Sequence, residues 1–312
     1  MDMLRNNFSW GFEADEPRTS GFFKLQKIRT KEKLISLHIP KVFVVLGQTA
    51  TGKSALAIKI AKKINGEIIS ADSRQVYKGL DIGTGKISKK DQKGVPHHML
   101  DIANPKKKFT VAEYKKLAEN KIEEIIARGK TPIICGGTGF YIDAITKGII
   151  FPEVPPNEKL RKKLISLSAI TLFNTLKKID PIRAKSIDQK NKVRIIRAIE
   201  IAKALGRVPP ITEAIPPYKF IKIGLYLPPD KLKKKVEKRV EKMFQDGLLD
   251  EIKNLKRARV SDKRLQELGF EYYKPTPEKV IKETLKYAKR QMQWFKRDKE
   301  IKWFDSSKKI NF

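Results

Sequence analysis

The sequence predicts an α/β fold: a P-loop parallel sheet with helices on both faces, plus an all-helical insertion domain. Short apolar runs of strand length, such as residues 42–46, alternate with stretches of helical period, which is typical of a parallel sheet covered by helices. A glycine-rich segment joins the first apolar run to the first helical stretch. Between the prolines of residues 152–156 and those of residues 209–217, only helical periods occur.

Apolar spacing and the residues that interrupt it place the individual elements. The expected strands are residues 42–46, 67–71, 132–135 and 220–226. The expected helices are residues 53–64 and 111–128, several across 157–205, and about 231–244, 248–258 and 277–298. We therefore expect a catalytic core made of residues 41–150 and 218–312, a helical insertion of residues 151–217, and a poorly ordered extension of residues 1–40.

The composition excludes several classes of protein. The 312 residues are 40% hydrophobic, which is enough for a core, and they include 1 cysteine, which excludes a disulfide framework. There is no apolar run of about 20 residues and no secretory signal, so we expect a cytoplasmic protein without a membrane span. The formal net charge of +33 indicates either a nucleic-acid partner or a lysine-rich background, because the charge is spread along the chain.

Residues 47–54 match the phosphate-binding pattern G-x-x-x-x-G-K-[ST] at every fixed position. In such a P-loop, backbone N–H groups and the start of a helix bind phosphate oxygens. The lysine adds a point charge, and the hydroxyl of the last residue can join a Mg²⁺ shell. The predicted diphosphate- or triphosphate-binding residues are Gly47, Gln48, Thr49, Ala50, Thr51, Gly52, Lys53 and Ser54.

The position of the acidic residue nearest to the P-loop favours a group-transfer enzyme over an ATP-driven motor. The strand at 132–135 runs into Gly136 without the carboxylate that a motor carries there. Asp72 instead follows the strand after the P-loop helix, where a carboxylate either meets a second substrate or only caps the next turn. Two alternative functions stay open at this point: a P-loop nucleoside or small-molecule kinase, and a non-catalytic RNA-binding protein with an inactive P-loop.

Four further segments closely resemble motifs of the tRNA dimethylallyltransferases. They are residues 69–86, ISADSRQVYKGLDIGTGK; residues 96–101, PHHMLD; residues 136–141, GGTGFY; and residues 287–298, YAKRQMQWFKRD. With the P-loop they follow the family order from Lys41 to about Asp305. The resemblance implies transfer of a dimethylallyl group from dimethylallyl diphosphate to N6 of the adenosine just 3′ of the tRNA anticodon, with release of diphosphate.

The resemblance also implies roles for single residues. Asp72 would be the general base with Ser54 nearby, and Arg239 would meet the diphosphate unless it lies on a solvated helix face. Mg²⁺ is the implied cofactor, held in part by Ser54. The basic and aromatic residues of 287–298 suit either RNA contacts or the core. The residues implied to bind tRNA are Asp72, Ser73, Arg74, Gln75, Thr138, Arg161, Arg194 and Arg197.

Two positions depart from the family pattern. Ser54 replaces the common threonine and keeps the hydroxyl, whereas Glu271 stands where many members carry a basic residue, which argues against a tRNA contact there. His97 and His98 lack a third ligand and are not expected to bind a metal. The partners that we expect are the tRNA anticodon stem-loop and dimethylallyl diphosphate, bound by a monomer that does not associate with membranes.

Overall fold

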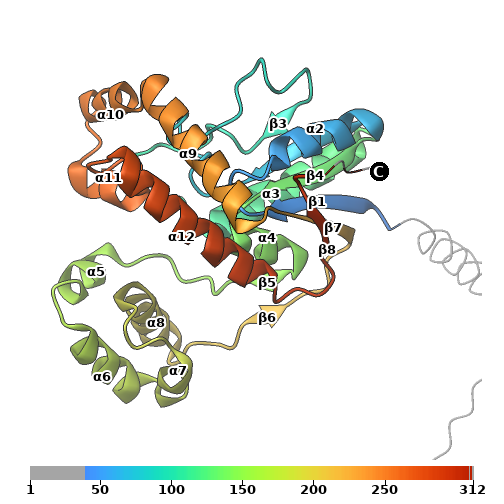
Figure 1. Ribbon diagram of the computed structural model, residues 1–312. Coiled ribbons are helices and arrows are strands. Elements are labelled where there is room, and N and C mark those ends of the chain that lie inside the picture. Colours follow the sequence, from blue (N-terminus) through green and yellow to red (C-terminus); the bar gives the residue numbers. More distant parts are fainter. Residues whose placement is uncertain (1–38, 309, 311–312) are drawn as a thin grey trace, which may run out of the picture. The chain divides into compact units, whose positions relative to one another are not determined.

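The computed structural model describes residues 39–308 and 310, and the chain divides into two units after Pro40. The prediction for residues 1–40 lies almost wholly outside the described residues. The second unit is built on a six-stranded sheet of order β3-β2-β4-β1-β7-β8, in which every pair of neighbours is parallel (Figure 1). The strands are Lys41–Gly47 (β1), Gly66–Ala71 (β2), His97–His98 (β3), Thr131–Gly136 (β4), Lys219–Tyr226 (β7) and Lys302–Asp305 (β8).

Helices cover both faces of this sheet, as predicted. Side chains alternate along a strand, so Val44 of β1 joins the hydrophobic cluster on one face and Val45 joins the cluster on the other. Helix α2 (Lys53–Lys63) packs on the face of Val45. Helices α3 (Val111–Ala127) and α4 (Gly139–Thr146) pack on the face of Val44.

Four helices follow β7, where the sequence predicted three. They are α9 (Pro229–Gln245), α10 (Leu248–Arg257), α11 (Asp262–Leu268) and α12 (Pro277–Phe295). Helices α9 and α12 run side by side (Figure 1) and share a cluster that contains Val236, Val240 and Val280. This pair brings two long helices to the sheet from a stretch of chain that is distant in sequence from the P-loop.

A second group of helices lies between two short strands, β5 (Ile149–Ile150) and β6 (Thr212–Glu213), which pair antiparallel. It has a hydrophobic cluster of its own, in which Leu172 and Ile195 are fully buried. The predicted border of an insertion domain at residues 151–217 stays a prediction. Among the described residues, no helix is long and apolar enough to cross a membrane. The helices are α5 (Glu158–Leu164), α6 (Ala169–Ile179), α7 (Pro181–Ser186) and α8 (Lys192–Leu205).

Candidate active site

A cavity of about 470 Å³ lies at the carboxyl ends of β1, β2 and β4. This is the edge of a parallel sheet where ligands bind in open α/β folds. The cavity is lined by the P-loop and the turn after β2 from one part of the chain, and by residues of α9, α12 and 269–271 from another. Segments more than 150 positions apart therefore form one enclosure, which sequence spacing alone does not reveal.

The backbone of the P-loop is fixed by two glycines. Gly47 has φ of 131°, and a Cβ atom there would lie 2.1 Å from the carbonyl oxygen of Leu225. Gly52 has φ of 82° and stands directly before the first residue of α2. Positive φ favours glycine at both positions, and at Gly47 the close approach to β7 also leaves no room for a side chain.

Lys53 lies at the base of the cavity, with its side chain turned onto the P-loop. Its Nζ donates a hydrogen bond of 2.6 Å to the carbonyl oxygen of Gln48, which also accepts a 2.7 Å bond from the hydroxyl of Thr51. Burial lowers the pKa of Lys53 to about 8, and the positive charge of Arg239 also lowers it, whereas Asp72 raises it. An anion bound in the cavity would therefore raise the pKa of Lys53 and stabilise its charged form.

Arg239 reaches from α9 across the cavity to the P-loop. Its Nη1 donates to the hydroxyl of Thr49 at 3.0 Å, and its Nη2 donates to the carbonyl oxygen of Thr84 at 3.0 Å. Burial lowers the pKa of Arg239, while Asp72 and Glu271 act in the opposite direction. The alternative of a solvated helix face does not hold, and a second cation stands beside Lys53.

Asp72 follows β2 and caps the next turn, one of the two alternatives that the sequence left open, while its contact with a second substrate stays a prediction. Its Oδ1 accepts hydrogen bonds from the backbone N–H groups of Arg74 (2.8 Å) and Gln75 (3.3 Å), so the carboxylate caps its own turn. Asp72 also lines the cavity with Ser73, Arg74 and Gln75. Thr138 supports this turn, because its hydroxyl oxygen accepts from the Ser73 N–H at 2.9 Å.

Helix α12 holds the P-loop through a residue whose role the sequence did not reveal. The side chain of Gln291 accepts from the N–H of Thr49 at 2.7 Å and donates to the carbonyl oxygen of Gly137 at 2.9 Å. Two aromatic residues of this helix pack in the core, since Phe295 is buried and Trp294 packs against the core and donates to Asp143 at 3.2 Å. Tyr287 and Arg290 of the same helix line the cavity.

Glu271 forms part of the cavity wall, and this placement was not predicted. Burial raises the pKa of the Glu271 carboxyl to about 7, against the lowering effects of its own backbone N–H, Arg74 and Arg239. Cys135 also lines the cavity, and burial raises the pKa of its thiol to about 11. A thiol with this pKa is neutral and unreactive near pH 7, so Cys135 offers no nucleophile.

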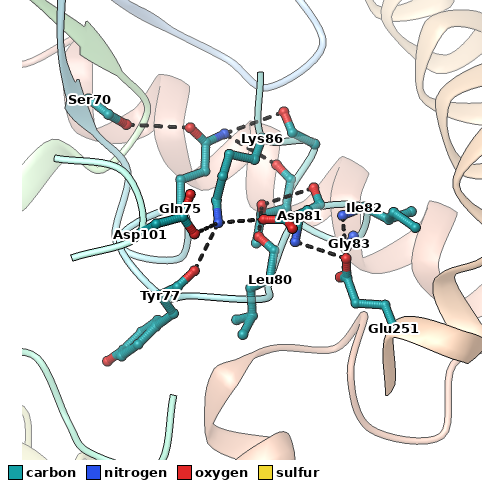
Figure 2. Close-up of polar contacts among 12 residues, drawn as sticks. Ser70, Gln75, Tyr77, Leu80, Asp81, Ile82, Gly83, Lys86, Asp101 and Glu251 are labelled. Carbon is teal, nitrogen blue, oxygen red and sulfur yellow. Dashed lines mark hydrogen bonds and ion pairs between the residues drawn. The ribbon is translucent and has the colours of Figure 1, made fainter. Parts of the chain in front are cut away.

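The loop that carries Thr84 is held at both ends by charged side chains. Lys86 Nζ donates to Asp81 and Asp101 at 2.6 Å each and to the carbonyl oxygen of Tyr77 at 2.9 Å. On the other side of the loop, the Glu251 carboxylate from α10 faces the backbone N–H groups of residues 81–83 (Figure 2). These contacts fix the part of the cavity wall that meets Arg239.

The arginines of the helical segment lie apart from this cavity. Arg161 makes a two-bond ion pair with Glu200 (2.6 and 2.8 Å), and Arg197 contacts the same carboxylate at 3.3 Å. The Glu200 side chain is 1% exposed, so these two arginines neutralise a buried charge. Arg194 is exposed. The structure does not bring these three predicted tRNA-binding residues to the cavity, and their contact with tRNA stays a prediction.

No group of three or more His, Cys, Asp or Glu side chains among residues 39–308 and 310 could hold a metal ion. His97 and His98 contact the carbonyl oxygen of Val95 (2.8 Å) and Glu67 (2.7 Å), respectively. Ser54 is exposed and lines the cavity. The structure places the Ser54 hydroxyl at the cavity, and its contact with Mg²⁺ stays a prediction.

The sequence profile described as IPP transferase matches residues 75–298. The chain belongs to the IPP transferase family. A tRNA dimethylallyltransferase of Halothermothrix orenii is 41% identical over 287 residues, which cover 85% of this chain and 88% of the relative. Its counterpart in Anoxybacillus flavithermus is 40% identical over 282 residues, with 85% and 90% covered.

Solved structures agree with membership of the IPP transferase family. The full-length tRNA isopentenylpyrophosphate transferase of Bacillus halodurans has a TM-score of 0.63 and 34% identity, with 86% of this chain and 90% of that chain covered. A eukaryotic dimethylallyltransferase acting on tRNA has a TM-score of 0.73 and 27% identity, with 86% and 74% covered. The protein is therefore a transferase of the IPP transferase fold.

Proposed function

We propose that the protein transfers a dimethylallyl group from dimethylallyl diphosphate to N6 of the adenosine 3′-adjacent to the anticodon in tRNA. The observation that carries this proposal is the convergence of the P-loop, Lys53, Arg239 and Asp72 on one cavity. Two cations and a set of backbone N–H groups suit the diphosphate of the donor, and the carboxylate suits the amine of the acceptor. Membership of the IPP transferase family supports the same reaction.

The cationic side of the cavity stabilises the leaving group. As the bond between the allylic carbon and the diphosphate oxygen breaks, its electron pair leaves with the diphosphate, and negative charge grows on the oxygens beside the P-loop. Lys53 and Arg239 are already held there by Gln48, Thr49 and Thr84. Preorganised donors of this kind stabilise developing charge without reorganising during the reaction.

The residues of the cavity fit a Mg²⁺ ion that arrives with the diphosphate. Mg²⁺ is commonly bound by one or two protein ligands together with phosphate oxygens and water, and the exposed Ser54 hydroxyl in the P-loop offers one such ligand. When bound, the ion would neutralise charge on the departing diphosphate. The remaining steps rest on the side chains of the protein.

Asp72 is the group that receives the proton. An exocyclic amine is a weak nucleophile because its lone pair is delocalised into the ring, so the amine needs a base as the N6–carbon bond forms. The two backbone N–H groups that bind Oδ1 of Asp72 fix the carboxylate at the cavity wall. A base positioned in this way contributes about 10²–10⁴-fold to the rate.

The acceptor adenosine lies in an RNA loop and has to be turned out of its stack to enter the cavity. Ser73, Arg74 and Gln75 stand beside Asp72 and would hold the extruded base. The formal charge of +33 suits a long polyanion. We further propose that a monomer acts on the anticodon stem-loop in the cytoplasm.

The test combines the purified protein with labelled dimethylallyl diphosphate, Mg²⁺ and unmodified tRNA. We expect label on the tRNA with the wild type and with Asp250→Asn, which removes an exposed carboxylate from α10, and a loss of label with Asp72→Asn. Consumption of ATP without any label on the tRNA would instead support a kinase. Equal labelling by the wild type and Asp72→Asn would refute the role of Asp72.

A further inference from the structure

The carboxylate of Glu251 occupies a pocket of backbone donors outside the cavity. Its Oε2 accepts from the N–H groups of Asp81 (2.9 Å) and Ile82 (2.7 Å), and its Oε1 accepts from the N–H of Gly83 (3.1 Å), as Figure 2 shows. Consecutive backbone N–H groups that converge in this way form an anion-binding nest. The nest is filled by a side chain that lies about 170 positions later in the sequence.

This contact sets the position of the loop that carries Thr84. Hydrogen bonds to an ionised acceptor are roughly twice as strong as neutral ones, so one carboxylate holds three successive residues of the loop. The next residue, Thr84, presents its carbonyl oxygen to Arg239 at 3.0 Å. A Cβ atom on Gly85 would lie 2.3 Å from Nη2 of Arg239, which shows how closely the loop and the guanidinium are fitted.

Glu251 also binds the opposite wall of the cavity. Its Oε1 accepts a 2.9 Å hydrogen bond from the hydroxyl of Tyr272, which is 1% exposed. Tyr272 directly follows Glu271, a residue of that wall, and a Cβ atom on Gly83 would lie 2.6 Å from the Tyr272 hydroxyl. One carboxylate therefore joins the loop of residues 81–85 to the turn of residues 269–272.

We infer that Glu251 is a positioning residue that acts through Arg239. By fixing the loop of residues 81–85, it fixes the carbonyl oxygen that orients the guanidinium, and thereby the distance of the guanidinium from Thr49 of the P-loop. Glu251 does not line the cavity itself. The inference rests on the proposed function, in which Arg239 meets the diphosphate of the donor.

The principal variant is Glu251→Gln, which keeps the size of the side chain and removes its charge. Asp250→Asn is the matched control, because Asp250 is the neighbouring carboxylate of α10 and is exposed beside Lys253. The Lys86 contacts with Asp81 and Asp101 and the Gln75 contacts with Thr84 and Gly85 do not involve Glu251, so the loop keeps these attachments in the variant. Tyr272→Phe removes only the link to the second wall.

The assay measures kcat and KM for prenyl transfer well below the melting temperature of each variant, and the affinity for inorganic pyrophosphate by calorimetry. Since a misplacement of about 1 Å can cost 10²-fold in rate, we expect Glu251→Gln to lower kcat/KM by about 10- to 100-fold and to weaken pyrophosphate binding. In an Arg239→Ala background, the same substitution should change either quantity by less than about threefold, because coupled residues are not additive. Asp250→Asn should match the wild type.

Two results would overturn the inference. Wild-type kcat/KM and pyrophosphate affinity in folded Glu251→Gln would show that the nest is structural only. If the fold-losses in kcat/KM and pyrophosphate affinity caused by Glu251→Gln and Arg239→Ala multiply in the double variant, the two residues act independently. Glu251 would then not act through Arg239. If the proposed function is wrong, the wild type itself will not transfer the prenyl group. In that case the pyrophosphate affinities of the single and double variants still decide whether Glu251 acts through Arg239.

Discussion

Substitution of Glu271 by glutamine should stabilise the protein at pH 8 and leave its stability unchanged near pH 4.5. Burial in the cavity wall raises the pKa of this carboxyl from the ordinary 4.5 to about 7. Well below pH 4.5 the carboxyl is protonated in both the folded and the unfolded state, so its ionisation does not contribute to the free energy of unfolding. As the pH rises from 4.5 to 7, the unfolded state releases its proton first, and the folded state becomes less stable.

The size of the effect follows from the two pKa values. At about 1.4 kcal/mol per pKa unit, the difference between 4.5 and about 7 corresponds to at most about 3.5 kcal/mol above pH 7. Because Glu271→Gln keeps the shape of the side chain and cannot ionise, the variant avoids this cost. The free energies of unfolding of the wild type and the variant should therefore diverge between pH 4.5 and pH 7, with the variant the more stable.

Urea unfolding of the wild type, Glu271→Gln and Glu153→Gln across pH 4.5–8 measures this difference. Glu153 is exposed, so its substitution should give the same free energy of unfolding as the wild type at every pH. A gap between wild type and Glu271→Gln that stays constant with pH, or that favours the wild type at pH 8, would refute the raised pKa of Glu271.

Three further predictions concern the diphosphate, the buried carboxylate of Glu67 and the helical segment. Arg239→Ala should weaken pyrophosphate binding in calorimetry by about 10-fold or more, since a hydrogen bond to a charged group contributes about 1.5–3 kcal/mol; equal affinity would contradict the role of Arg239. Although burial raises it, hydrogen bonds from Lys130, His98 and Arg128 lower the pKa of Glu67 to about 2. The carboxylate therefore stabilises the fold above pH 4.5, and this stabilisation is lost as the pH falls towards 2. Glu67→Gln should lower the free energy of unfolding by about 3–5 kcal/mol at pH 7 in urea unfolding, and by less in acid. A loss that does not change with pH would contradict this prediction. Arg161→Ala should lower the melting temperature because it removes an ion-pair partner of the buried Glu200. Arg194→Ala should weaken tRNA binding in a filter assay without changing the melting temperature. The opposite pattern would show that Arg161 contacts tRNA and that Arg194 supports the fold.

Local sequence was sufficient to predict the first strand, the P-loop and its helix. Residues 41–63 carry an apolar run, two glycines and a helical period that act on neighbouring residues. Shorter elements were missed, because the two residues of β3 and the seven residues of α11 are too few to show a period. The parallel sheet with helices on both faces was predicted correctly from alternation alone.

Local patterns predicted the site only where it is continuous in sequence, whereas Arg239 was assigned to it by the family resemblance and lines the cavity. The P-loop and the turn of Asp72 follow strands directly, so their place at the sheet edge was foreseeable. Gln291 and Glu271 were not, because their positions depend on how α12 and the turn before it pack over residues more than 100 positions away. The same applies to Glu251, because its hydrogen-bond donors include backbone N–H groups, which nearly every residue carries and no sequence pattern identifies.

The central claim is that the cavity joins a dimethylallyl group to one particular adenosine. The most direct measurement is mass-spectrometric mapping of unmodified tRNA after reaction with the protein, dimethylallyl diphosphate and Mg²⁺. We predict a single added dimethylallyl group, on N6 of the adenosine 3′-adjacent to the anticodon, and no addition when that adenosine is replaced by guanosine. Addition at another nucleoside, or tRNA left unmodified under these conditions, would contradict the account.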